Sequence, residues 1–240
     1  MDKPKKPASG VAAKNARGQR RNHAARLTTR KSALPKKAGG AKKARGEEAR
    51  ERVLHAALEC FGAFGFEGTS TRAVAERAGL SHPLLLYHFD SKEKLWLSTM
   101  EDVLGRYRQE LDQRLKQIDR KDAAAGLRAF IENFVSFSAR VPQLYRIMTQ
   151  ESTQGSKRIH WLIDTHLRES FNEVRDMIRR GQAEGRVRDG DSARLYYAIV
   201  GLAGTLLSVS AEFRLLTGRD VFTEAEMHHT LGFIFEFVFI

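Results

Sequence analysis

The sequence predicts an all-α protein with a three-helix head and a larger helical body behind it. Apolar residues recur at helical spacing through most of the chain after residue 46, and glycine or capping residues interrupt this spacing at intervals. We find no alternating strand pattern and no internal repeat. We therefore expect a basic tail over residues 1–46, a head over 47–92 and a body over 93–240.

The tail carries the positive charge of the chain. The whole sequence has 41 Lys and Arg against 29 Asp and Glu; 15 of the basic residues and one acid lie in residues 1–46, which leaves 26 basic and 28 acidic residues elsewhere. With almost no large apolar side chains, the tail cannot bury enough surface to offset its ordering entropy, so we expect disorder. Two roles stay open: a solvated segment without function, or an arm that contacts phosphates.

Cysteine usage and hydropathy restrict the class of protein further. Cys60 is the only cysteine, which favours a reducing interior; we interpret it as a buried structural thiol, with a redox sensor as the alternative. No run of about eighteen apolar residues predicts a membrane span, so a cytoplasmic protein is expected. The sequence shows no nucleophile–base set, phosphate loop, dinucleotide fingerprint or metal-ligand cluster. We therefore expect no enzyme activity, no metal and no cofactor.

The head begins with an expected helix over residues 47–64. Apolar residues, including Val53, Ala57 and Phe61, share one face of this helix, and acids at its start suit the helix dipole. Gly65 should stop it. The next helix is expected near Thr71, with a capping hydroxyl just before it.

The segment 69–95 is the most informative part of the sequence. It indicates two short helices joined by a turn at Gly79, since glycine takes a left-handed conformation at little cost. Ser81 is expected to cap the second helix, with Pro83 in its first turn. This layout is that of a helix-turn-helix, which places its second helix in the DNA major groove. The agreement of small residue, turn, cap and proline in one segment favours DNA binding over an ordinary helical hairpin.

The second of these helices should have an inner and an outer side. Leu85 and Phe89, four residues apart, are expected to hold it on the scaffold, and Ser91 should cap the next helix, over residues 92–118. The remaining body helices are expected over residues 122–139, 142–152, 156–184, 191–216 and from 223 to the C-terminus.

Two body helices have faces that favour a homodimer. In the helix over 191–216, an apolar seam from Leu195 to Leu216 recurs at steps of four and three, and small residues lie on the adjacent face. The last helix is apolar nearly all round, so it must be covered on more than one side. A monomer whose own core covers both helices is the alternative. The expected interface residues are Gly201, Gly204, Ser208, Ala211, Phe233 and Phe237.

Residues 47–98 resemble the tetracycline-repressor (TetR) family of bacterial regulators. The matching residues are Phe61, Gly65, Phe66, Thr69, Thr71, Val74, Ala75, Ala78, Gly79, Ser81, Tyr87, His88, Phe89, Lys92, Glu93 and Leu95. The rest of the chain is similar to the family only in the number and order of its helices. The resemblance implies an all-α homodimer in the bacterial cytoplasm, associated with the nucleoid, that binds palindromic double-stranded DNA as a repressor and releases it when a small molecule binds the body.

The resemblance also implies roles for individual head residues. Thr71 and Lys92 match phosphate contacts, and Arg72 matches a position that often reaches a base, although a solvated arginine is the alternative. His88 matches a recognition contact or packs at the helix end. The full set of expected DNA contacts is Thr71, Arg72, Ser81, His82, Leu84, Tyr87, His88 and Lys92.

The head departs from the family pattern in two respects. Leu84 and Leu86 stand where many members carry a small or hydroxyl residue and an aromatic one, so polar contacts are lost and contacts with thymine methyl groups gained. The head also has little positive charge, since five Lys and Arg between residues 47 and 92 oppose seven acids. We therefore hypothesise that the tail supplies much of the non-specific affinity for DNA.

The effector site is expected between the central helices of the body. An aromatic stripe at helical spacing is also typical of a plain core, and that alternative stays open. The expected lining residues are Phe130, Phe134, Phe137, Arg140, Tyr145, Met148, Trp161 and His166. The alternative function is a DNA-organising or division-linked protein with the same head and no small-molecule ligand. An enzyme with a catalytic helical body is a further alternative, which the missing catalytic set disfavours.

Overall fold

The computed structural model describes residues 37–240, and side chains from residue 44 onward. Residues 1–36 of the expected tail therefore lie outside the described residues. The last part of that tail, residues 37–46, is not irregular as expected but forms the first turns of α1 (Lys37–Gly68). The sequence missed this extension because the segment has no apolar face to reveal a helix.

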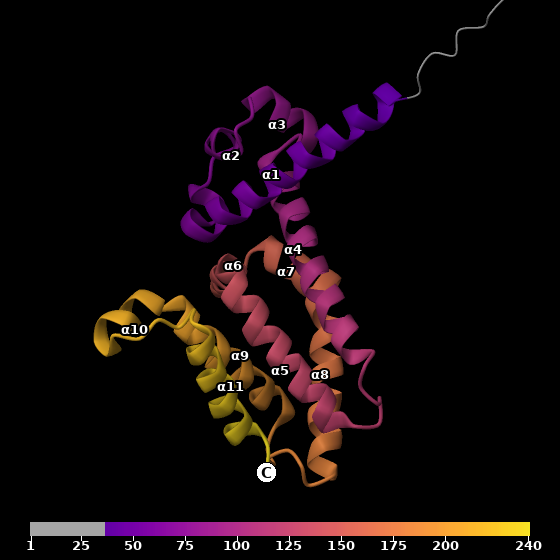
Figure 1. The fold of residues 1–240 in the computed structure, drawn as a ribbon, viewed down its shortest axis with the longest axis vertical. Helices are drawn as coiled ribbons and strands as arrows, with labels where there is room; N and C mark the ends of the chain where they lie inside the picture. Colours follow the sequence, from indigo (N-terminus) through magenta and orange to yellow (C-terminus); the bar gives the residue numbers. More distant parts are fainter. Residues whose placement is uncertain (1–36) are drawn as a thin grey trace, which may run out of the picture.

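Three helices form the head, which lies at the top of Figure 1. α1 is broken at Gly65, whose backbone has φ 69° and ψ 179°, a conformation that favours glycine. α2 (Thr71–Arg77) is capped by Ser70, whose hydroxyl accepts a hydrogen bond from the Ala73 amide at 3.1 Å. α3 (His82–Phe89) starts where the sequence predicts, with Ser81 at the N-cap.

Buried side chains hold α3 in the core that the head shares with α4. Leu85 is completely buried and Phe89 is nearly so, which confirms their expected inward position. Cys60 is also buried in this core, and burial raises the pKa of its thiol. A protonated buried thiol behaves as a small apolar side chain, which favours the structural interpretation of Cys60.

We expect Leu85→Ala to lower the free energy of unfolding by about 2–5 kcal/mol, because it leaves a cavity in a fully buried site. Leu84→Ala on the same helix is the matched control. Because Leu84 is 38% exposed, this substitution should lower the free energy of unfolding far less. Urea denaturation followed by circular dichroism measures both. Equal losses for the two variants would contradict the position of Leu85 in the core.

The body consists of helices that run below the head (Figure 1). α4 leaves the head and extends down one side of the body. The helices of the body are α4 (Lys92–Leu115), α5 (Ala123–Arg140), α6 (Pro142–Gln154), α7 (Lys157–Leu162), the π-helix η1 (Ile163–Leu167), α8 (Arg168–Ala183), α9 (Ser192–Ser208), α10 (Ser210–Thr217) and α11 (Glu224–Val238).

Two apolar clusters form the core. The first joins head residues to the start of α4 and to α6 and α7, with Trp96 and Met100 completely buried in it. The second lies lower, among α4, α5, α8, α9 and α11. Head and upper body therefore share one continuous core, and movement of α6 or α7 must disturb the packing of the head.

Two long helices expected from the sequence are interrupted. The helix over 156–184 is divided by η1, for which we find no sequence signal. The helix over 191–216 breaks at Val209 (φ −103°, ψ 27°), between Ser208 and Ser210. Serine and valine are weak helix formers, and serine side chains compete for backbone hydrogen bonds. The expected seam therefore does not run through to Leu216, which is 77% exposed.

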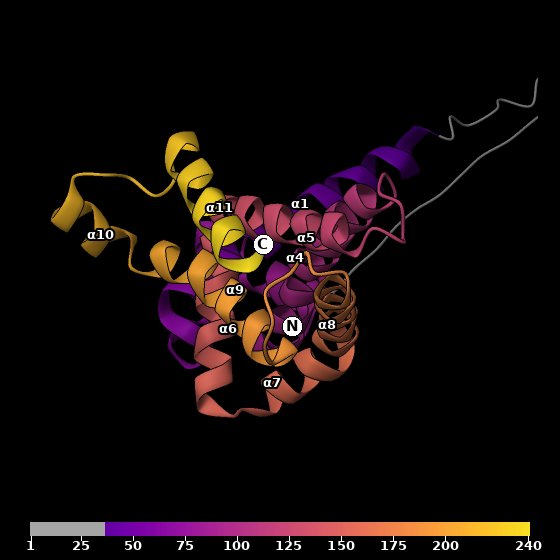
Figure 2. The same ribbon diagram turned by 90° about the horizontal axis from the view of Figure 1, so that it is seen from below.

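α9 and α10 meet at an angle of 72°, and α10 projects from the body in both views (Figures 1 and 2). Taken singly, none of the described helices is both long and apolar enough to cross a membrane; this pair reaches that length only when joined. Extended pairing within residues 37–240 is confined to one isolated bridge, between Val187 and Phe239. The described chain is all-α, as predicted.

Candidate nucleic-acid interface and ligand site

α3 presents its outer face to solvent. Tyr87 is 81% exposed, and its ring meets His88 edge to face, with 5.5 Å between ring centres. Leu84 is 38% exposed on the same helix, and the Ser81 hydroxyl makes no capping hydrogen bond. Leu85 and Phe89 fix the helix from behind, so these outer groups stand on a rigid support. This exposed face is available to a DNA groove.

The starts of α2 and α3 are held together by two of the expected contact residues. Thr71 Oγ1 and His82 Nε2 lie 2.9 Å apart, within hydrogen-bond distance. Arg72 follows Thr71 on the exposed side of α2 and makes no hydrogen bond or ion pair with a described residue. Its guanidinium is free to reach a base or a phosphate.

Lys92 has a structural engagement that the sequence does not reveal. Its Nζ lies 4.6 Å from the ring centre of Phe66 and donates a hydrogen bond to the Glu67 carbonyl oxygen at 3.2 Å. A phosphate contact would have to compete with these two interactions. Lys92 therefore joins the end of α1 to the start of α4, whatever it also does on DNA.

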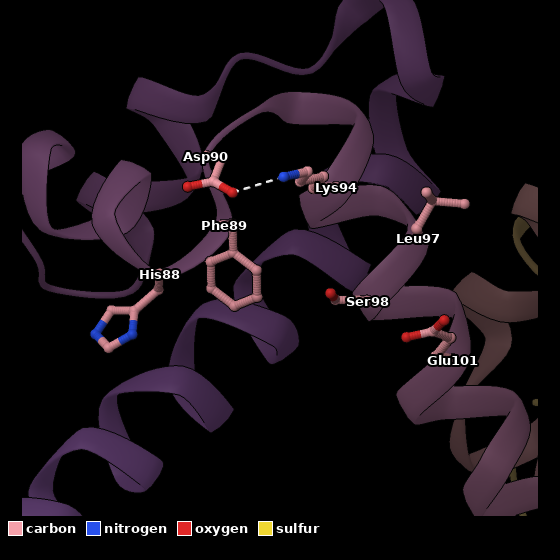
Figure 3. A pocket seen from close by; sticks show the side chains of 7 residues that line it. All are labelled: His88, Phe89, Asp90, Lys94, Leu97, Ser98 and Glu101. Carbon is pink, nitrogen blue, oxygen red and sulfur yellow. Dashed lines mark hydrogen bonds and ion pairs between the residues drawn. The ribbon is translucent and has the colours of Figure 1, made fainter.

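His88 borders a hollow of about 240 Å³ between the end of α3 and α4 (Figure 3). Asp90, at the end of α3, has φ 57° and pairs with Lys94 Nζ at 2.7 Å. The hollow is lined by His88, Phe89, Asp90, Lys94, Leu97, Ser98 and Glu101. His88 therefore combines a partly buried, packed position with proximity to the recognition face, and both interpretations of it stay open.

The charges of the head are partly neutralised within the fold. Arg77 forms an ion pair with Glu59, and Lys94 with Asp90. Arg50 lies over the ring of Phe89 at 5.6 Å. Among the side chains that the structure describes, the small excess of acids in the head is therefore not offset by a cluster of free cations beside α3.

Arg72→Ala should relax base preference by roughly 1–3 kcal/mol at one position of the binding site, because a lost Arg–guanine pair costs about that much. The measurement uses a duplex obtained by selection from a random pool. Single-base variants of that duplex compete with it for binding to the protein. Arg52→Ala, on exposed α1, is the matched control. An equal loss on every sequence would make Arg72 a phosphate contact instead.

The junction between head and body centres on Phe66. Arg158 of α7 lies 3.8 Å from the ring centre of Phe66 and pairs with Glu151 of α6 at 2.9 Å. The Glu151 side chain is only 4% exposed, and Ser156 also donates a hydrogen bond to it. A Cβ added to Gly62 would lie 2.7 Å from Gln143 Cβ, so α1 and α6 touch closely. The orientation of the head is therefore tied to α6 and α7.

Three of the expected ligand residues lie in one aromatic cluster. Phe130 stacks on Phe134 at 6.1 Å and on Tyr196 at 6.2 Å, and Phe137 meets Tyr107 edge to face at 5.3 Å. Burial raises the pKa of Tyr196 to about 12, so its hydroxyl stays protonated.

The other expected ligand residues are distributed around the body. Trp161 meets His166 at 5.1 Å, and burial lowers the pKa of His166 against a smaller opposing effect of Glu101. Met148 packs against the first core cluster. Arg140 is exposed and pairs with Glu110 at 2.5 Å, so it does not point into the body. The structure does not gather all eight residues around one site.

A larger hollow, of about 650 Å³, lies at the far end of the body from the head, among α4, α5 and α8. Charged groups such as Arg108, Asp112 and Glu173 line it, and none of the eight expected ligand residues does. Arg108 pairs with Glu173 at 2.6 Å and with Asp112 at 2.8 Å, so these charges are already satisfied.

The expected interface residues divide into two groups. Phe233 and Phe237 of α11 are 61% and 39% exposed, and Ser208 and Ala211 are also exposed. Gly201 is half-buried, and a Cβ there would meet nothing within 4 Å. Gly204 differs from expectation: a Cβ there would lie 1.9 Å from the ring of Tyr145. The small residue makes room for a side chain of the same chain, not for a second helix.

Sequence reasoning missed Asn133, Phe171, Tyr107 and Tyr196. Asn133 is completely buried on α5, and its Oδ1 has no hydrogen-bond partner. It stands at helical spacing among the stripe of Phe130, Phe134 and Phe137, and this polar residue in an apolar face was the available signal.

Family models match both parts of the chain. Residues 53–99 match the model described as bacterial regulatory proteins of the tetR family, and residues 124–238 match the tetracyclin repressor-like C-terminal domain. The chain belongs to the TetR family. It is a helix-turn-helix transcriptional regulator, and the expected family is confirmed.

Individual TetR-family relatives agree. The HTH-type transcriptional regulator RutR of Escherichia coli is 26% identical over 193 residues, which cover 79% of this chain and 89% of RutR. The HTH-type transcriptional regulatory protein RaaS of Mycobacterium tuberculosis is 30% identical over 162 residues, which cover 66% of this chain and 70% of RaaS. The solved structure of the ketosteroid transcriptional regulator KstR2 of Mycobacterium tuberculosis matches with a TM-score of 0.66 and 17% identity. The match covers 80% of this chain and 95% of the KstR2 chain. This last likeness shows the fold alone.

Proposed function

We propose that the chain is a homodimeric repressor that binds a palindromic operator and releases it when a small, largely apolar ligand enters the body. Such a protein works at the nucleoid, in the bacterial cytoplasm. The observation that carries the proposal is the outer face of α3, where Tyr87 is 81% exposed while Leu85 is completely buried. A recognition helix needs this combination of free contact groups and fixed support.

Dimerisation is supported by apolar surface at one side of the body. Phe233, Phe237 and Tyr197 are exposed on α11 and α9, and Leu215 and Leu216 are exposed on the projecting α10. Exposed apolar groups concentrated on neighbouring elements are typical of a protein interface. Two heads related by a two-fold axis would read two half-sites about 34–36 Å apart.

Ligand response is supported by the junction at Phe66. A ligand that displaces α6 or α7 changes the contacts of Arg158 with Phe66 and Glu151. It thereby favours a different separation of the two heads, and the half-site spacing is no longer matched. For this release, the ligand must bind more tightly to the state whose head separation does not fit the half-sites than to the state that binds DNA.

The test is selection of duplexes from a random pool with the full chain. We expect an enriched palindrome with two equivalent half-sites, and sedimentation velocity should show a dimer. Phe233→Glu should shift the protein toward monomer and lose the palindrome, whereas His55→Glu, exposed on α1 of the head, is the control and should stay dimeric. A monomeric wild-type chain, or enrichment of single half-sites, would exclude the dimeric repressor.

The alternative, a ligand-independent DNA organiser, shares the same head. Mapping of bound sites across the genome separates the two proposals. One or a few sites beside transporter or catabolic genes support the repressor, and many dispersed sites support the organiser.

A further inference from the structure

A chain of aromatic rings runs through the middle of the body from four helices. Successive ring centres lie 4.9–6.5 Å apart. The chain runs from Phe171 of α8 to Tyr196 of α9, continues through Phe130 and Phe134 of α5, and ends at Tyr107 of α4. These helices lie together in the lower body (Figure 1). We call this set the aromatic box; its rings are Tyr107, Phe130, Phe134, Phe137, Phe171 and Tyr196.

One polar side chain stands inside this apolar surrounding without adequate partners. Asn133 is 0% exposed, and the polar partners of its side chain both belong to Tyr107: Nδ2 donates a long hydrogen bond to the Tyr107 carbonyl oxygen at 3.5 Å, and the amide also interacts with the Tyr107 phenol group. Its Oδ1 has no partner. The amide oxygen therefore stays unsatisfied in the described structure. A buried polar group left unpaired destabilises the fold, and such groups are found where a ligand or another function uses them.

The groups that face Asn133 and the rings are rich in electrons. Aromatic faces, phenol oxygens and the amide oxygen all complement positive charge. Two rings already accept cations on their outer sides: Arg140 lies 5.4 Å from Phe137, and Arg175 lies 5.1 Å from Phe171. Arg140 is held by Glu110, so its charge stays outside.

One side of the box lies near the surface of the protein. Phe171 and Tyr196 are half-buried, and Tyr196 meets Tyr197, which is 67% exposed, at 5.3 Å. Phe171, Tyr196 and Tyr197 therefore form the side of the box that lies nearest to solvent, on α8 and α9.

We propose that the aromatic box is the effector site and takes a compact organic ammonium ion with at least one N–H, which donates a hydrogen bond to Asn133 Oδ1 while the rings surround its charge. This inference rests on the proposed ligand response and specifies its chemistry. An apolar body on the ligand packs against the phenylalanine rings.

The probe is phenethylamine, which is protonated at pH 7, measured by titration calorimetry and thermal unfolding of the full chain. Its N,N,N-trimethyl analogue keeps the charge but lacks N–H, phenethyl alcohol lacks the charge, and 3-phenylpropanoate reverses it. We expect phenethylamine to bind tightest, and each analogue to bind roughly 10-fold or more weaker. No binding of phenethylamine at millimolar concentration, or tighter binding of the propanoate, would overturn the proposal.

Asn133→Leu separates a ligand site from a plain core, because leucine has a similar shape and no polar atoms. We expect this variant to keep or raise the Tm of the free protein and to bind phenethylamine roughly 10- to 100-fold more weakly. Unchanged phenethylamine binding would overturn the proposal. Should the variant not fold, Tyr196→Ala at the half-buried rim provides the same readout.

Phe235→Leu is the matched control, since Phe235 lies in the same core cluster but meets Phe239 outside the box, at 5.8 Å. It should leave phenethylamine binding unchanged. DNA binding of the same preparations is measured on the selected palindrome. If the chain binds the palindrome but not phenethylamine, the ammonium site is wrong and the proposed repressor function stands. If the chain binds no palindrome, the proposed repressor function is itself wrong.

Discussion

Removal of residues 1–36 is expected to weaken non-specific DNA binding by roughly 100-fold or more at low salt, because eleven Lys and Arg are lost with only one acid. The slope of log K against log salt should become shallower by about 0.9 for each phosphate contact that disappears, so about five contacts would remove a slope of about 4–5. The deletion stops before Lys37, where α1 begins, so the head stays complete. Fluorescence anisotropy on a random duplex at several salt concentrations provides the measurement.

The control keeps the length of the tail and replaces its eleven Lys and Arg by Gln. If charge is the cause, this variant should behave like the deletion, whereas base preference on the selected palindrome should stay close to that of the full chain. An unchanged salt slope in both variants would show that the tail is a solvated segment with no part in binding. The expectation follows from the charge balance of the head, where five basic residues oppose seven acids between residues 47 and 92.

Arg158→Ala is expected to lower the free energy of unfolding by about 3–5 kcal/mol, because it leaves the Glu151 carboxylate buried without its partner. The substitution also removes the guanidinium from the ring of Phe66, so the head loses one of its contacts with the body. Chemical denaturation measures the stability. The affinity for the selected palindrome, with and without phenethylamine, measures the coupling between body and head.

Two comparisons isolate the buried pair. The double variant Arg158→Met with Glu151→Gln removes both charges and should recover most of the lost stability. Arg168→Ala breaks the ion pair between Arg168 and Asp164, whose side chains are 64% and 67% exposed. This exposed pair should contribute little, so the substitution should lower the free energy of unfolding by at most about 1 kcal/mol. A loss in Arg158→Ala no larger than in Arg168→Ala would mean that the junction does not depend on Arg158.

Much of the head was predictable because its signals are local. Gly79, the serine at position 81 and the Leu85–Phe89 spacing fix a turn, a helix start and an inner face within a few residues of each other. Gly79 has a positive φ, and Leu85 and Phe89 are buried, as expected; Ser81 stands at the N-cap position, but its hydroxyl makes no capping hydrogen bond. The engagement of Lys92 was not predictable, because Phe66 and the Glu67 carbonyl lie at the far end of another helix.

The body was predictable as a succession of helices but not as a set of contacts. Gly204 illustrates the difference: a small residue indicates close approach by something, and only the fold shows that this is the Tyr145 ring of the same chain. The phenylalanine stripe on α5 indicated a buried face, while the rings of Tyr107, Phe171 and Tyr196 come from three other helices.

The sequence by itself determined the all-α class, the position of the helix-turn-helix and the concentration of charge in the tail, because caps, turns, apolar periodicity and composition act over a few residues. Only the tertiary structure decided which distant groups lie together: Arg158 and Glu151 beside Phe66, and the aromatic box around Asn133. The physical reason is that burial and pairing depend on groups distant in the chain. The same asparagine is ordinary on a helix in solution and costly when it is buried among aromatic side chains.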